Sequence, residues 1–121
     1  MIAIKKRIII AGSRDFQNYR QFCEAVDRDL SRLKEEYELV ILSGHCSGTD
    51  TMAERYAREH GYGLEVYPAQ WQLGAAAGPS RNRHMVEKAD YAIVFPSGGP
   101  GTQSLVAFAK EKGIPLRIHP I

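Results

Sequence analysis

Cysteine is scarce in this chain, and long hydrophobic runs are absent. Its two cysteines, Cys23 and Cys46, fit neither a disulfide framework nor paired metal-ligand spacing. The nearest approach to a metal set is His45, Cys46 and His84, whose spacing matches no recognised site, so we expect no metal and no other cofactor. Because we recognise neither a signal peptide nor a membrane-spanning run, we expect a cytoplasmic, reduced protein with no membrane partner.

An excess of charge of one sign is also missing. Sixteen Lys and Arg stand against fourteen Asp and Glu, which gives a formal net charge of +2, and the two signs are interspersed. Such a sequence lacks the basic patch that binds duplex nucleic acid, and a single Trp offers little stacking surface to single strands. Nucleic acid is therefore disfavoured as a partner, whereas a small anionic ligand fits. Length and composition predict one domain over residues 1–121.

Five short apolar runs rich in β-branched residues predict strands. They are RIIIAG (7–12), LVILSG (39–44), LEVYPA (64–69), YAIVFPSG (91–98) and PLRIHPI (115–121). Helical patterns alternate with them over 19–37, from about 50 to 60, from about 79 and over about 102–112. This alternation, with strands apolar on both faces, predicts an α/β fold: a Rossmann-like three-layer sandwich with a five-stranded, mainly parallel sheet.

Unusual segments follow four of the predicted strands, at the sheet edge where parallel α/β proteins bind ligands. Glycine-rich turns that lead into helix N-termini present backbone N–H groups to an anion, and we expect this anion to be a phosphate group. Tight strand–helix connections are the alternative role of these glycines. No Walker or dinucleotide fingerprint is present. The candidate ligand-binding residues are Gly12, Ser13, Arg14, Ser43, Gly44, Gly48, Thr49, Asp50, Trp71, Arg81, Asn82, Gly98, Gly99, Gly101 and Thr102.

Several charged and aromatic residues have more than one candidate role. Arg14 and Arg81 suit a phosphate, and Arg81 and Arg83 lie in early helical turns where a cation opposes the dipole. Asp50 is either a helix cap or a ligand contact. The single Trp71, in the long connection 68–78, suits base stacking, a lid or an interface. A serine nucleophile is weakly supported, because no His and Asp partners are evident.

Four ordered motifs, taken together, resemble the YspA-like (cpYpsA-related) branch of the SLOG superfamily. They are GSRDF (12–16), SGHCSGTD (43–50), AGPSRNRHMV (77–86) and GGPGTQSLVAFAKEKGIP (98–115). This superfamily also includes proteins similar to SMF/DprA and to the LOG (Lonely Guy) phosphoribohydrolases. The resemblance implies a Rossmann-like fold and a nucleotide or nucleotide-derived ligand.

The resemblance to LOG enzymes assigns a phosphate cradle to Gly98, Gly99, Gly101 and Thr102, and it matches Arg81 to their active-site arginine. Ser80 and Ser104 stand where those enzymes carry carboxylates. Since stabilising an oxocarbenium-like centre and activating water require carboxylates, the chain departs from the pattern of an N-glycosidase. The catalytic residues stay open, and the candidates are Asp15, Asp50 and Arg81.

These observations predict a binding protein for a nucleotide or nucleotide-derived small molecule, acting as a sensor or as an enzyme of undefined reaction. The alternatives are a nucleotide N-glycosidic hydrolase or ribosyl transferase and, with less support, a single-stranded nucleic-acid binder. The apolar, flexible stretch beside Trp71, LGAAAG, leads us to expect a homo-oligomer, namely a two-fold dimer.

Overall fold

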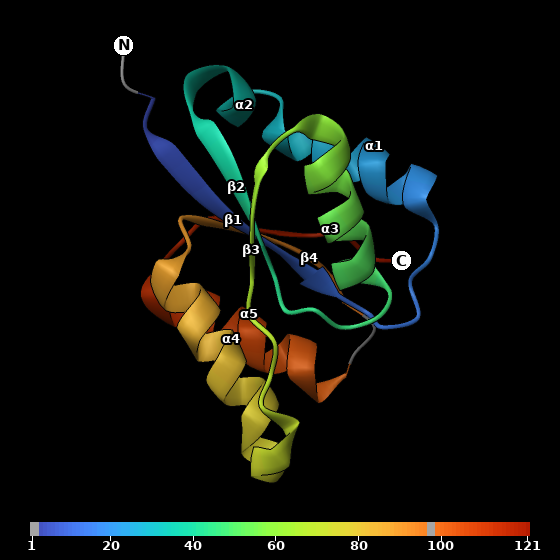
Figure 1. Ribbon diagram of the computed structural model, residues 1–121, viewed down its shortest axis with the longest axis vertical. Coiled ribbons are helices and arrows are strands. Elements are labelled where there is room, and N and C mark those ends of the chain that lie inside the picture. Colours follow the sequence, from blue (N-terminus) through green and yellow to red (C-terminus); the bar gives the residue numbers. More distant parts are fainter. Residues whose placement is uncertain (1–2, 97–98) are drawn as a thin grey trace.

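Five parallel strands form one sheet in the computed structural model, which describes residues 3–96 and 99–121 (Figure 1). The strand order is β3-β2-β1-β4-β5, and each neighbouring pair runs parallel. The strands are β1 (Lys5–Gly12), β2 (Glu38–Ser43), β3 (Gly63–Val66), β4 (Tyr91–Phe95) and β5 (Leu116–Ile118). The predicted α/β class and five strands are thereby confirmed, and the sheet is parallel throughout.

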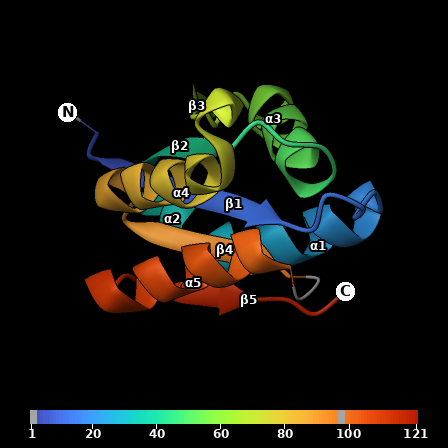
Figure 2. The ribbon, with the colours of Figure 1, turned by 90° about the horizontal axis from the view of Figure 1, so that it is seen from below.

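Helices cover both faces of this sheet (Figures 1 and 2). Side chains of α1 and α3 pack on one face, and those of α4 and α5 pack on the other. The helices are α1 (Tyr19–Leu30), α2 (Leu33–Glu36), α3 (Thr49–His60), the 3-10 helix η1 (Trp71–Ala76), α4 (Ala77–Lys88) and α5 (Pro100–Lys112). The predicted three-layer sandwich is confirmed.

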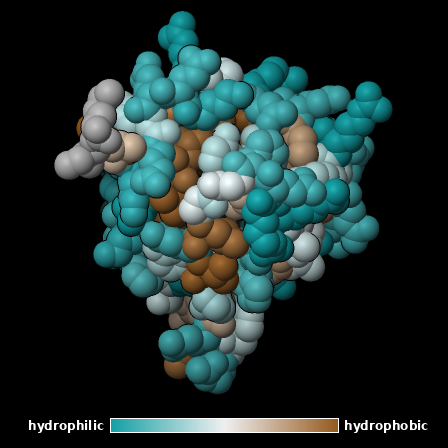
Figure 3. Space-filling model, turned by 45° about the horizontal axis from the view of Figure 1, so that its top comes forward, coloured by the Kyte–Doolittle hydropathy of each residue, from teal (hydrophilic) through white to brown (hydrophobic). Residues whose placement is uncertain are grey.

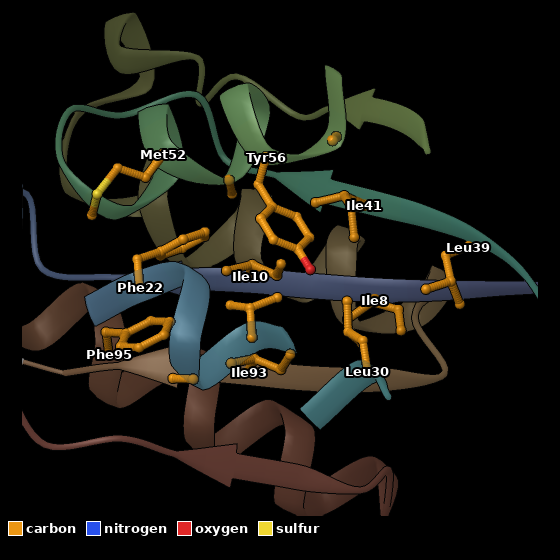
Figure 4. Packing of buried hydrophobic residues seen from close by; sticks show 14 of the residues in the cluster. Ile8, Ile10, Phe22, Leu30, Leu39, Ile41, Met52, Tyr56, Ile93 and Phe95 are labelled. Atoms are coloured by element: carbon orange, nitrogen blue, oxygen red, sulfur yellow. The ribbon is translucent and has the colours of Figure 1, made fainter. Parts of the chain in front are cut away.

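The central strand β1 shows how the sequence produces the two apolar layers. Successive side chains of a strand point to opposite faces, so Ile8 and Ile10 enter the layer of α1 and α3, while Ile9 enters the layer of α4 and α5. All three are completely buried. Phe22 of α1 fills the first layer and its ring contacts those of Tyr56 and Phe95 (Figure 4).

The first predicted helix is shorter in the structure than its apolar stripe. It ends at Leu30, because both the backbone N–H and the hydroxyl of Ser31 donate to the carbonyl of Arg28, three residues back. The short helix α2 follows, and Tyr37 is already extended. The apolar positions continued in sequence, but a local hydrogen bond ended the helix.

Three other boundaries differ by one or two residues. The third long helix begins at Ala77 rather than near Pro79, so that this proline lies within its first turn. Helix α5 begins at Pro100 rather than Thr102, and α3 at Thr49. Within the predicted irregular connection 68–78, residues Trp71–Ala76 form η1, which is interrupted at Gly74 (φ 73°).

The surface is mostly hydrophilic on the face shown in Figure 3, with a band of hydrophobic residues near its centre. Among the described residues, the large apolar side chains that remain exposed are Ile4, Val66, Trp71, Leu73, Ile118 and Ile121. Over the described parts of the chain, every helix is too short or too polar to cross a membrane.

The strand order places a topological switch point between β1 and β4. The chain builds β1, β2 and β3 outward in one direction, then returns to pair β4 with the other side of β1. The loops that leave the carboxyl ends of β1 and β4 therefore diverge to opposite faces, and the crevice between such loops is where open α/β sheets bind ligands.

Candidate functional site

A cavity of about 420 Å³ lies at this switch point. It is bounded by the loop after β1, by the start of α3, by one side of α4 and by the first turn of α5. Its lining includes ten of the predicted site residues, namely Gly12, Ser13, Arg14, Asp15, Asp50, Arg81, Asn82, Gly99, Gly101 and Thr102. The predicted Gly98 lies outside the described residues.

The end of β1 is held tightly against β4. Gly12 pairs with Phe95 in the sheet, and the N–H of Ser13 donates to the Phe95 carbonyl over 2.8 Å. Gly12 has φ 156°, and a Cβ at this position would collide with the Phe95 carbonyl oxygen. The glycine therefore lets the β1 loop turn away from the sheet beside its neighbour, which opens the crevice.

The turn before α3 is fastened to the same loop. Both the N–H and the hydroxyl of Thr49 donate to the Ser13 carbonyl, over 3.0 and 2.9 Å, and the Ser47 hydroxyl donates to the Arg14 carbonyl over 3.2 Å. Gly48 (φ 70°) lies so close to the Arg14 backbone that no side chain fits. Gly48 and Thr49 therefore do not line the cavity; they fix the loop that does.

Arg81 joins three elements around the cavity. Its Nη1 donates to the Gly44 carbonyl over 2.5 Å and to the Tyr67 carbonyl over 3.5 Å, and its Nε donates to Asn82 Oδ1 over 2.8 Å. Gly44 lacks a Cβ where one would overlap this guanidinium. The sequence predicted a phosphate-facing cation here; the structure adds that Arg81 holds the turn after β2 against α4.

Asn82 connects α4 to the first turn of α5. Its buried amide donates to the Gly101 carbonyl and to Ser104 Oγ, both over 2.9 Å. Ser104 in turn donates to the Gly101 carbonyl. Gly99 is the N-cap of α5 and has no side chain to cap it, and Pro100 supplies the first helical position. The first N–H groups of a helix lack partners within the helix and carry its positive dipole end.

Asp50, in the first turn of α3, is the most unusual ionisable group of the cavity. It is 6% exposed, and its Oδ2 accepts the N–H of Cys46 over 3.0 Å. Burial raises the pKa of Asp50 to about 6, although the Cys46 N–H and the charges of Arg81 and Arg14 act to lower that pKa. A carboxyl near its pKa at neutral pH both accepts and supplies protons, as functional carboxyls often do.

Ser43 is buried, is not among the residues that line the cavity, and belongs to a polar cluster with Glu54 and the exposed His45. Its hydroxyl donates to Glu54 Oε2 over 2.8 Å, and the same oxygen lies 2.9 Å from His45 Nδ1. His45 has φ 60°, a left-handed conformation that is uncommon outside glycine. The sequence motifs did not point to Glu54. It follows Asp50 by four residues on the same predicted helix, and this spacing was the signal that could have indicated it.

Trp71 stands outside the cavity wall. It is 54% exposed, and its ring lies 5.3 Å from the Arg14 guanidinium carbon. Arg83, the third cationic candidate, points elsewhere, with its guanidinium over the Phe108 ring. Arg14 and Arg81 therefore line the cavity, whereas Arg83 does not.

The cavity also has lining residues that sequence reasoning did not select. These are Ala11, Cys46, Met85, Pro100 and Leu105. Met85 follows Arg81 by four residues and so shares its side of α4. The described residues contain no group of three or more His, Cys, Asp or Glu side chains arranged for a metal ion.

Residues 6–74 match the family described as YAcAr, the YspA, cpYpsA-related SLOG family, and this segment is more than half of the chain. The chain belongs to this family. The resemblance inferred from the motifs is thereby confirmed. The matched segment includes the loops after β1 and β2, whereas α4 and the first turn of α5 lie beyond it.

Two solved structures share the fold. DNA processing protein A (DprA) from Streptococcus pneumoniae aligns with a TM-score of 0.70 and 22% identity, over 95% of this chain and 50% of that one. A structural-genomics target, TM1055, aligns with a TM-score of 0.66 and 16% identity, over 93% of this chain and 72% of that one. This chain thus spans half the length of DprA. No curated protein matches the sequence.

The contact between Gly48 and Arg14 predicts a large loss of stability for Gly48→Ala. Gly74→Ala is the matched control, because Gly74 has a similar backbone conformation (φ 73°, ψ −145°, against φ 70°, ψ −119° at Gly48) but no described atom within 4 Å of an added Cβ. We expect Gly74→Ala to lower the free energy of unfolding by about 1–3 kcal/mol, and Gly48→Ala by at least ~2 kcal/mol more, because it adds a clash. Urea unfolding measures both; equal losses would contradict the packing.

The raised pKa of Asp50 predicts how its contribution to stability varies with pH. Since the folded state holds this proton more tightly than the unfolded state, the contribution is fully present below the unfolded pKa, near 4, and is lost as pH rises through about 6. Asp50→Asn has no carboxyl to titrate at this position, so its stability does not fall in this way. We expect the free energy of unfolding of the variant, relative to that of wild type, to rise by about 2–3 kcal/mol from pH ~4 to ~8.

Urea unfolding of both proteins across that pH range gives the comparison, because the other titrating groups cancel in the difference. A difference in unfolding free energy that does not change with pH would contradict the assigned burial of Asp50.

Proposed function

We propose that this chain binds a nucleotide or nucleotide-derived small molecule in the cavity, with a phosphate against the first turn of α5. One observation carries the proposal: the cavity at the switch point includes Gly99, Gly101 and Thr102 from the N-terminus of a 13-residue helix. Helix N-termini combine unpaired N–H groups with a positive dipole end, and they bind phosphate for that reason.

The size and charge of the cavity support this assignment. About 420 Å³ falls within the range of small-molecule sites, which are roughly 300–1,000 Å³. Arg14 and Arg81 supply two cations, and the apolar Met85 and Leu105 supply wall surface. A flat ring attached to a charged phosphate suits this mixture of surfaces.

Nucleic acid is the less favoured ligand class. DprA is named as a DNA processing protein, and its likeness to this chain is a likeness of fold. The net charge of +2 and the single Trp argue against a strand-binding groove here.

We also propose that the chain forms a two-fold dimer through η1. Trp71 and Leu73 are 54% and 59% exposed on this segment, and none of its six residues is buried. Aromatic side chains of this kind are common anchors of interfaces. Since the Trp71 ring lies against Arg14, such an interface would adjoin the ligand.

Gly101→Ala tests the phosphate site without disturbing the fold, because no described atom lies within 4 Å of the added Cβ. The methyl group crowds the approach of a phosphate to the helix N-terminus, so we expect AMP and inorganic phosphate to bind about tenfold more weakly or worse. Gly78→Ala is the matched control: it alters the second residue of α4, where the added Cβ meets Trp71 at 3.8 Å.

Calorimetric titration and ligand-dependent thermal shifts measure the affinities of wild type and both variants. Unchanged binding by Gly101→Ala, or an equal loss in Gly78→Ala, would contradict the phosphate position.

Hydrolysis of the N-glycosidic bond is the second candidate, and the two carboxyls of the cavity, Asp15 and Asp50, favour it. Against it, Ser104 is occupied with Asn82 and Gly101 where the LOG pattern has a carboxylate. We expect incubation with AMP to release no adenine above the buffer control, as measured by chromatography. Adenine release that disappears in both Asp15→Asn and Asp50→Asn would establish the hydrolase instead.

A further inference from the structure

Asp50 has a buried oxygen with no hydrogen-bond partner among the described residues. Its Oδ2 accepts the Cys46 N–H, whereas Oδ1 receives no hydrogen bond from residues 3–96 or 99–121. Leaving a buried polar atom unpaired costs about 1–3 kcal/mol, and such atoms in native proteins call for an explanation. Asp50 is 6% exposed and lines the cavity, so a ligand there can supply the missing partner.

The neighbouring charged groups do not satisfy this oxygen. Arg81 directs Nη1 to two backbone carbonyls and Nε to Asn82, and Arg14 lies beside the Trp71 ring. Glu54, whose charge also acts on Asp50, accepts from Ser43 and lies against His45. These contacts leave the second oxygen of Asp50 without a partner among the described residues, at the wall of the cavity.

We propose that Asp50 binds a hydroxyl group of the ligand, so that the ligand is a phosphorylated sugar or polyol spanning the edge of the sheet from α5 to α3. This inference rests on the proposed phosphate position. The first turn of α5 offers N–H donors, which require an acceptor such as phosphate. Asp50 offers an acceptor, which requires a donor. A sugar phosphate carries both groups in one small molecule.

A hydroxyl fits Asp50 better than an ammonium group does. Arg14 and Arg81 line the same cavity and offset the charges of Asp15 and Asp50, so a cation gains little attraction there. Because the pKa of Asp50 is raised to about 6 by burial, the group is present in both protonation states near neutrality. A hydroxyl both donates and accepts, so it bonds to either state, whereas an ammonium only donates.

Because Oδ1 is buried, this bond requires the carboxyl to rotate. The terminal torsion of an aspartate side chain is soft and roughly two-fold, so we expect one oxygen to turn toward the ligand while the other keeps the Cys46 N–H.

The experiment compares ribose 5-phosphate with tetrahydrofurfuryl phosphate, which has the same ring and phosphate but no hydroxyls. Inorganic phosphate is the third probe, and affinities come from calorimetric titration. We expect wild type to bind ribose 5-phosphate at least about tenfold more tightly than tetrahydrofurfuryl phosphate, as a charge-assisted hydrogen bond gives. In Asp50→Ala this preference disappears, while inorganic phosphate binds as well as to wild type or better, because a negative charge is removed.

Asp50→Asn is a second variant, which tests the inference if Asp50→Ala fails to fold. Since the Cys46 N–H needs the remaining oxygen, the amide NH₂ takes the second position and replaces an acceptor with a donor. We expect this variant to retain a reduced preference, intermediate between wild type and Asp50→Ala. Far-UV circular dichroism and urea unfolding establish that each variant is folded before titration.

The outcomes separate this inference from the function on which it rests. Equal affinity of wild type for the two phosphate esters, or a preference that is undiminished in whichever of the two variants folds, would overturn the hydroxyl contact and leave the phosphate site in place. If AMP binds more tightly than inosine 5′-monophosphate and only that difference depends on Asp50, the donor is a base amino group and the inference is wrong. Failure of inorganic phosphate, AMP and ribose 5-phosphate to bind at all would remove both proposals.

Discussion

The backbone of Ser13 is the junction on which the cavity depends. Its N–H donates to the last residue of β4, and its carbonyl accepts two hydrogen bonds from Thr49 at the start of α3. One peptide segment therefore ties together the two strands of the switch point and the helix on one face of the sheet. Gly12 and Gly48 make this possible, because a side chain at either position would collide with neighbouring backbone. Without this junction the loop that carries Arg14 and Asp15 would not be fixed beside α3.

The sequence predicted the layers well, because burial on both faces leaves a simple signal. Each strand is a short apolar run, and the alternation with helical stripes leaves few topologies for a parallel sheet. The ends of the helices were harder to predict than the layers. The stripe from Tyr19 to Tyr37 follows helical steps, yet Ser31 ends α1 through bonds to Arg28 that side-chain periodicity does not report. Likewise Pro79 marks a first turn without marking its first residue, so α4 starts two residues earlier.

How well a site residue could be predicted depended on whether it acts through its backbone or through its side chain. Glycine-rich turns predicted where the cavity would lie, and the loops after β1, β2 and β4 do meet there. Residue type alone did not tell lining from support. Thr49 and Ser43 have polar side chains suited to a ligand, but their hydroxyls donate to Ser13 and Glu54 within the protein, and both side chains are buried. Met85 and Leu105 were not predicted as site residues, because the sequence does not distinguish an apolar helical residue of the core from one that lines a cavity.

The charges around the cavity limit what can occupy it. Arg14, Arg81, Asp15 and Asp50 line the same cavity, so the charges of the four side chains nearly cancel, and the N-terminus of α5 adds a partial positive charge. A simple inorganic anion would gain from the helix end but would meet the repulsion of a buried carboxylate. Moving the negative charge toward α5 and placing neutral donors near α3 removes that repulsion and uses the unpaired Asp50 oxygen. The arrangement therefore favours a molecule that is anionic at one end and hydroxylated at the other over a compact anion.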